Sequence, residues 1–89
     1  MAVKFPLPPE HRYGRTSHPL VHDGKDSHQD SMWLRLWQAR VKQLFPDERL
    51  TPSGYVDGVT VRIAVALQTE AGIPATGLID EETWDLAWQ

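Results

Sequence analysis

A chain of 89 residues and 10.1 kDa is large enough for one small domain and too short for two hydrophobic cores. Nine basic side chains against twelve acidic ones leave a net charge of −3, which argues against nucleic acid as the main partner. The absence of cysteine excludes disulfides, thiolate metal sites and a thiol nucleophile. No apolar run reaches the length of about 18 residues that a membrane span needs, and the first residues lack an apolar segment. We therefore predict neither a transmembrane segment nor a signal peptide.

The composition changes near residue 30. Residues 1–30 contain all four histidines and four of the seven prolines, and their charges cancel. Pro6, Pro8 and Pro9 favour an extended, polyproline-like segment, because proline restricts φ and removes a backbone donor. We predict that residues 1–30 form an extended N-terminal arm and that residues 31–89 form the folded domain.

Three segments of the predicted domain have helical periodicity. We expect helices over 31–44, 58–71 and 81–88, joined by turns rich in proline, serine and glycine. Asp30 or Ser31 is expected to cap the first of them. The predicted core positions, in chain order, are Trp33, Trp37, Arg40, Val41, Leu44, Thr60, Ile63, Ala64, Leu67, Ala71, Trp84, Ala87 and Trp88. The predicted fold is all-α, a small three-helix bundle with an extended N-terminal arm.

One short pattern occurs twice, 23 residues apart. GYVDGVT and GLIDEET share a glycine, an aliphatic residue, an aspartate and a threonine at the same spacing. Asp57 and Asp80 are expected to cap the helices that follow, and Thr60 and Thr83 lie where a hydroxyl can reach back to the cap. The repeat predicts the same turn, cap and helix start at two places in the chain.

The residue patterns do not favour catalysis. None of the four serines lies in a G-x-S-x-G motif. The acid pairs Asp47–Glu48 and Glu81–Glu82 are neighbours in sequence, so they do not face each other on a helix. We predict that the protein is not an enzyme and needs no cofactor.

The histidines of the arm raise the question of a metal site. His18 and His22 are four residues apart, and Asp23, Asp26 and His28 follow them. A proline lies between the first two histidines, and the glutamate of an H-E-x-x-H motif is missing. We predict an exposed polar arm rather than a zinc site.

The stretch from Pro52 to Leu86 resembles the peptidoglycan-binding domain that occurs at the ends of bacterial and phage cell-wall hydrolases. The positions that match the family pattern are Gly54, Tyr55, Val56, Thr60, Leu67, Gln68, Gly72, Ile73, Gly77, Ile79, Thr83 and Trp84. Ser53 and Asp57 depart from the pattern in the first turn, where the family usually has aspartate and glycine. With the first helix included, the resemblance covers residues 31–88 and implies the family's helical fold and its peptidoglycan ligand.

The arm carries a second, shorter resemblance. FPLPPEHRYG, residues 5–14, is similar to the segment that precedes this domain in lysins of phages that infect actinobacteria, with Glu10 in place of a glycine. The resemblance implies a phage source. Phe5, Leu7 and Tyr13 would be apolar side chains in water unless the arm packs on the helices or binds a partner.

These observations favour a non-catalytic peptidoglycan-binding module carried by a bacteriophage, on the virion surface or released from the infected cell. The alternative is a virion structural protein, either a decoration protein or a minor capsid or tail subunit, anchored to other virion proteins by residues 1–30. Neither hypothesis includes a nucleic acid or a membrane as partner. The glycan or stem peptide would lie in a shallow groove, for which the candidate residues are Tyr55, Asp57, Arg62, Gln68 and Trp88. Each polar member also has a structural explanation, because Asp57 can cap a helix, Gln68 can bond a loop and Arg62 can be solvated.

Overall fold

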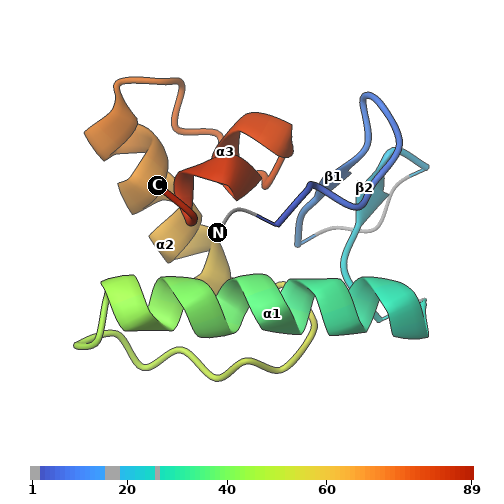
Figure 1. Ribbon diagram of the computed structural model, residues 1–89, viewed down its shortest axis with the longest axis horizontal. Helices are drawn as coiled ribbons and strands as arrows, with labels where there is room; N and C mark the ends of the chain where they lie inside the picture. Colours follow the sequence, from blue (N-terminus) through green and yellow to red (C-terminus); the bar gives the residue numbers. More distant parts are fainter. Residues whose placement is uncertain (1–2, 16–18, 26) are drawn as a thin grey trace.

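The computed structural model describes residues 3–15, 19–25 and 27–89. Its elements in chain order are β1 (Arg12–Tyr13), β2 (Val21–His22), α1 (His28–Leu44), α2 (Gly58–Ala71) and α3 (Glu81–Leu86). In Figure 1, α1 runs horizontally with the segment that joins it to α2 drawn below it, while α2, α3 and the two strands lie above it from left to right. The arm and the three helices therefore form one body.

The prediction of an all-α fold is wrong. The described residues contain a two-stranded parallel sheet, in which Arg12 pairs with Val21 and Tyr13 with His22. Tyr13 also forms an antiparallel bridge to Ile79, with N···O distances of 2.9 and 2.8 Å. Strands of two residues are too short to show the alternation from which a strand is predicted. The fold is mixed, with three helices and a small sheet built from the arm.

The helix boundaries differ from the prediction at two of the three helices. α1 begins at His28 because Ser27, and neither Asp30 nor Ser31, is its cap; the Ser27 hydroxyl accepts from the Asp30 N–H at 3.3 Å. α2 has the predicted bounds and ends at Gly72 in the left-handed conformation, with φ of 74°. α3 ends at Leu86, two residues earlier than predicted.

The buried face of α1 is not the predicted one. Trp37 and Val41 are fully buried, as expected, but Trp33 and Leu44 are 39% and 40% exposed. The buried residues of α1 are Leu34, Trp37, Gln38 and Val41. A hydropathy pattern counts glutamine as polar, so it places the core face on the wrong side of this residue. On α2, Ala71 is exposed and the core face again includes a glutamine, Gln68.

The arm contributes two aromatic side chains to the core. Tyr13 is fully buried and Phe5 is 8% exposed. The Phe5 ring lies 5.7 Å from the Trp84 ring in an edge-to-face arrangement, and the Trp84 indole N–H donates to the Val3 carbonyl at 2.6 Å. Trp84 in turn stacks on Trp37 of α1 at 6.5 Å. Residues 3–13 are therefore held by the same core as the helices.

Candidate functional site

The first repeated turn is held by a buried glutamine from α1. The Gly54 N–H donates to Gln38 Oε1 at 2.9 Å, and Gln38 Nε2 donates to the Tyr55 carbonyl at 2.9 Å and to Thr60 Oγ1 at 3.0 Å. These bonds join the helix before the turn, the turn itself and the first turn of α2. The backbone beneath Tyr55 is therefore fixed by the core.

The second repeated turn is held in the same way from α2. The Gly77 N–H donates to Gln68 Oε1 at 2.9 Å, and Gln68 Nε2 donates to the Leu78 carbonyl and to Thr83 Oγ1, both at 2.9 Å. The repeat thus extends to the preceding helix, which the sequence did not reveal because Gln38 and Gln68 precede their turns by different numbers of residues. With these bonds made and its side chain buried, Gln68 is a structural residue rather than a surface that faces a ligand.

Both repeated aspartates cap the helices that follow. Asp57 Oδ1 accepts from the Thr60 N–H at 2.9 Å and from the Thr60 hydroxyl at 2.7 Å. Asp80 Oδ1 accepts from the Thr83 N–H at 2.9 Å. Both threonine hydroxyls also accept from a glutamine, Thr60 from Gln38 and Thr83 from Gln68. Asp57 therefore caps α2, and its role in ligand binding stays a prediction.

Tyr55 is exposed at the surface of the first turn. Its side chain is 39% exposed, and the Lys25 ammonium lies 5.0 Å from the ring centroid, a cation–π distance. A hollow of about 420 Å³ beside the ring is lined by Gly24, Lys25, Ser27, His28, Ser31, Gly54 and Tyr55. The residues around this hollow thus include an aromatic, a basic and three polar side chains.

The wall of this hollow comes from the segment before α1, which the sequence did not associate with Tyr55. The Val56 N–H donates to the Asp23 carbonyl at 2.8 Å. Gly24 lies so close to the Gly54 carbonyl that a Cβ at this position would clash with it, and its φ is +94°. A glycine is therefore needed for the two backbones to meet.

Arg62 and Trp88 lie in other environments. Arg62 is exposed and pairs with Glu48, with Nη2 and Oε2 2.6 Å apart. Trp88 is half-buried beneath Arg40, whose guanidinium carbon lies 5.8 Å from the ring centroid, and the Arg40 Nε–H donates to the Ala87 carbonyl at 2.7 Å. Of the five predicted ligand residues, Tyr55 is the one that faces the hollow described above.

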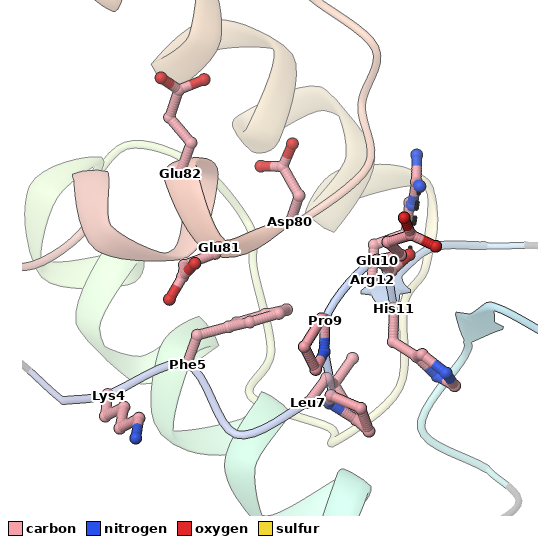
Figure 2. Close-up of a pocket in the computed structure, with 11 residues that line it drawn as sticks. Lys4, Phe5, Leu7, Pro9, Glu10, His11, Arg12, Asp80, Glu81 and Glu82 are labelled. Atoms are coloured by element: carbon pink, nitrogen blue, oxygen red, sulfur yellow. Dashed lines mark hydrogen bonds between the residues drawn. The ribbon is translucent and has the colours of Figure 1, made fainter.

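A second cavity, of about 620 Å³, lies between the arm and the start of α3 (Figure 2). Figure 2 shows the Phe5 ring and Pro9 facing each other across it. The lining residues are Lys4, Phe5, Leu7, Pro8, Pro9, Glu10, His11, Arg12, Asp80, Glu81 and Glu82. Apolar walls with charges of both signs suit a ligand that carries an aliphatic part, an amine and a carboxylate. Glu10 has a φ of 71°, a conformation that favours glycine.

Two histidines and an aspartate connect the arm to α1. His22 Nδ1 lies 2.7 Å from Asp30 Oδ2, and His22 Nε2 lies 2.8 Å from His11 Nδ1. The Asp30 carboxylate accepts from His22 Nδ1–H. In neutral His22 the Nε2 atom then carries the lone pair and accepts from His11 Nδ1–H. His22 thus uses both ring nitrogens in a chain of hydrogen bonds that fastens β1 and β2 to α1.

The metal hypothesis falls partly outside the described residues, where His18 and Asp26 lie. Among the residues that the structure describes, no group of three or more histidine, aspartate or glutamate side chains is arranged to hold a metal ion.

Tyr13 is the buried titratable group nearest to this chain of hydrogen bonds. Its ring lies 6.3 Å from the His22 ring, and its hydroxyl has no hydrogen-bond partner among the described residues. Burial, and secondly the negative charge of Asp30, raise the pKa of Tyr13 well above its usual value. Tyr13 is therefore a neutral core residue at physiological pH.

No protein-family model, curated protein or solved structure matches the chain. The resemblance to peptidoglycan-binding domains thus stays a prediction that depends on the sequence motifs. Within residues 3–15, 19–25 and 27–89, no helix combines the length and the apolar character needed to cross a bilayer.

Proposed function

We propose that the protein is a non-catalytic peptidoglycan-binding module and that the glycan lies against Tyr55. The observation that carries this proposal is the exposed Tyr55 ring beside a hollow lined by Lys25 and two serines. A sugar has an apolar C–H face that suits an aromatic ring and a rim of hydroxyls that suits polar side chains. The Lys25 ammonium lies 5.0 Å from the centroid of the Tyr55 ring, so a glycan bound against this ring would also lie near Lys25.

The rigidity of the first turn supports a binding role. Gln38 bonds the backbone on both sides of the turn, and Gly24 packs directly against Gly54. A backbone held in this way needs no further ordering when a ligand binds, so the entropy cost at the Tyr55 backbone is small.

The cavity of Figure 2 supports a ligand with a peptide part. Peptidoglycan stem peptides combine small aliphatic groups with carboxylates and amines. The cavity places apolar Phe5 and Pro9 between basic Arg12 and acidic Glu81. This arrangement suits the peptide in charge and size.

The test is co-sedimentation of the full chain with purified actinobacterial peptidoglycan. We expect Tyr55→Ala to weaken binding on the order of tenfold, which corresponds to about 1.4 kcal/mol, because the ring contact is lost. Trp33→Ala is the matched control, since Trp33 is also 39% exposed but lies on α1. Tyr55→Phe keeps the ring and should keep most of the affinity.

Two results would contradict the proposal in different ways. If the wild-type chain stays in the supernatant, peptidoglycan is not its ligand. If the wild type sediments and Tyr55→Ala sediments equally well, the module binds the wall elsewhere, and Glu81→Gln and Arg12→Gln then test the cavity of Figure 2.

The alternative of an arm-anchored virion protein has less support from the contacts. The apolar side chains that would hold the arm to a neighbouring subunit include Phe5 and Tyr13, and both are buried in this chain's own core. A comparison of residues 1–89 with residues 31–89 would therefore remove part of the core along with the arm. Point substitutions on the surface are the cleaner test.

A further inference from the structure

The hydrogen bonds that join the arm to α1 pass through two histidines in direct contact. His11 Nδ1 lies 2.8 Å from His22 Nε2, and His22 Nδ1 lies 2.7 Å from Asp30 Oδ2; we call these three residues the histidine chain. Both imidazoles are partly exposed, so protons from solvent can reach them. Histidine changes its charge in the range between about pH 5 and pH 8, so the histidine chain is a place where pH can act on the fold.

The histidine chain can take up one proton without losing a hydrogen bond. When both imidazoles are neutral, His22 donates through Nδ1 to Asp30 and accepts through Nε2 from His11 Nδ1–H. When His22 gains a proton, its Nε2–H becomes a donor, and His11 accepts at Nδ1 once its own hydrogen has moved to Nε2. The charged His22 then also forms an ion pair with Asp30.

A second proton does not fit the same arrangement. With both imidazoles protonated, His11 Nδ1 and His22 Nε2 are both donors, and no lone pair lies between them. Two positive charges would also face each other, with their nitrogen atoms only 2.8 Å apart. The contact between the two histidines must therefore open when both are charged.

The charged groups around the two histidines come from several elements. Those that line the cavity of Figure 2 together with His11 are Lys4, Glu10, Arg12, Asp80, Glu81 and Glu82. Asp23 and Asp30 line a hollow of about 480 Å³ together with His22, and the neutral Tyr13 ring lies 6.3 Å from the His22 ring. Acidic side chains outnumber basic ones in these surroundings, so the surrounding charge does not oppose the entry of protons.

Of the two strands, β2 is the one that can move when this contact opens. β1 is held by the core, because Tyr13 is fully buried and exchanges two backbone hydrogen bonds with Ile79. Val21 and His22 of β2 are partly exposed, and β2 is joined to the helices by its pairing with β1 and by the bond to Asp30. Loss of the histidine contact therefore weakens the attachment of β2 more than that of β1.

The residues that follow β2 form the wall of the hollow beside Tyr55. The Asp23 carbonyl accepts from the Val56 N–H at 2.8 Å, and Gly24 and Lys25 line the hollow. A displacement of β2 thus reaches this wall through one or two peptide units.

We propose that the histidine chain is an acid-sensitive switch. Residues 21–25 stay attached to the helices while at most one of His11 and His22 is protonated, and they are released when both are. The buried core contains neither imidazole, so the helices stay packed in the released state. The switch does not depend on the wall-binding proposal; if that proposal holds as well, binding through the Tyr55 hollow weakens in acid.

The experiment follows the amide and imidazole signals of the ¹⁵N-labelled full chain by NMR from about pH 7.5 to about pH 5, the range in which histidine titrates. At the upper end we expect His11 to carry its hydrogen on Nδ1. In acid we expect the amide signals of residues 21–25 and 54–56 to change together, while those of α2 and α3 keep their positions. Unchanged signals of residues 21–25 after both histidines have become charged would overturn the proposal.

His11→Asn is the decisive variant, because its side-chain amide places a donor or an acceptor where His11 Nδ1 lies and does not titrate. Rotation of this amide lets it bond to His22 in either protonation state. We expect the variant to lose the acid response of residues 21–25. His28→Asn is the matched control and should keep the response, since it removes an exposed histidine of α1 outside the histidine chain. A response in His11→Asn equal to that of the wild type would assign the switch to another group.

Urea denaturation gives a second readout that needs no peptidoglycan. In acid the unfolded chain binds a proton at each of the two histidines, whereas the closed histidine chain binds one fewer, so stability falls as pH decreases. Until residues 21–25 are released, we expect the unfolding constant of the wild type to rise, relative to His11→Asn, by up to about tenfold for each pH unit below about pH 6. The same pH dependence in both proteins contradicts the switch. Absence of peptidoglycan binding at every pH overturns the wall-binding proposal alone.

Discussion

The two repeated turns have the same internal construction and different surroundings. Gly54 and Gly77 have φ of 88° and 76°, and each is bonded to a glutamine of the preceding helix. The residue that follows the glycine differs in exposure. Tyr55 is 39% exposed next to Lys25, whereas Leu78 is half-buried. One local design thus presents an aromatic ring to solvent at one place and an aliphatic side chain to the protein at the other.

The N-terminal arm causes this difference. In the second turn, Ile79 exchanges two backbone hydrogen bonds with Tyr13, and Leu78 lies against Gly14, where a Cβ would be 2.7 Å from Leu78 Cδ2. In the first turn, the segment before α1 makes one backbone hydrogen bond, from Val56, and leaves the Tyr55 side chain open. A repeated motif therefore does not predict a repeated function, because the covering segment decides which copy can meet a ligand.

Loss of the Tyr13 ring, which packs over the second turn, should have the largest effect on the free energy of unfolding. Tyr13→Ala deletes a fully buried ring that contacts Phe5, Trp84 and His22. We expect the free energy of unfolding to fall by about 3–5 kcal/mol, as for other buried aromatic residues, measured by urea denaturation.

Tyr13→Phe is the control for this substitution. It keeps the ring and removes a hydroxyl that has no partner among the described residues, so the stability at neutral pH should be unchanged or slightly higher. A loss of less than about 1 kcal/mol in Tyr13→Ala would contradict the arm's place in the core.

Loss of either glutamine should have the next largest effect on stability, and peptidoglycan binding should then show which of the two turns meets the ligand. Gln38→Leu and Gln68→Leu each remove the acceptor of a glycine N–H and a donor to a backbone carbonyl and to a threonine hydroxyl. We expect each to cost about 2–4 kcal/mol in urea denaturation, because several buried polar groups lose their bonds. In the folded protein, only Gln38→Leu should also weaken peptidoglycan binding, since it releases the backbone of Tyr55. Equal weakening by both variants would assign the ligand to a site that the two turns share.

Alkaline pH should reduce stability through Tyr13, the buried tyrosine that covers the second turn. Burial raises the pKa of Tyr13 in the folded state, so above about pH 10 the unfolded chain releases a proton that the folded chain keeps. This contribution to stability is complete below about pH 10 and is lost as pH rises, by up to about 1.4 kcal/mol per pH unit. Urea denaturation between neutral and alkaline pH should show this slope in the wild type. The slope should be reduced in Tyr13→Phe, and an equal slope in that variant would show that another group causes it.

The sequence was a good guide wherever the interaction is local. The aspartate caps at Asp57 and Asp80, the bounds of α2 and the two glycine turns were predicted, since a cap bonds a backbone N–H only three residues away. The predicted start of α1 was wrong because Ser27, Asp30 and Ser31 are all residue types that cap helices, and the sequence does not show which of them does so.

The candidate site could be predicted only in part. The sequence points to Tyr55 for its ring, which does lie beside a hollow, but it also points to Gln68 for its amide, which is buried. It does not identify Lys25, because the distance of this residue from Tyr55 in the sequence gives no sign that the two side chains meet. Contacts of this kind depend on how the chain returns on itself.

The sequence alone determined the composition limits, two helix caps and most of the helical segments, all of which depend on propensity and on bonds between near neighbours. Only the tertiary structure decided the two-residue strands, the orientation of α1 and the different exposure of the two repeated turns. The Trp84–Val3 hydrogen bond, which joins residues 81 positions apart, shows the reason. A contact at such a separation is stabilised by the whole core, and no short stretch of sequence contains it.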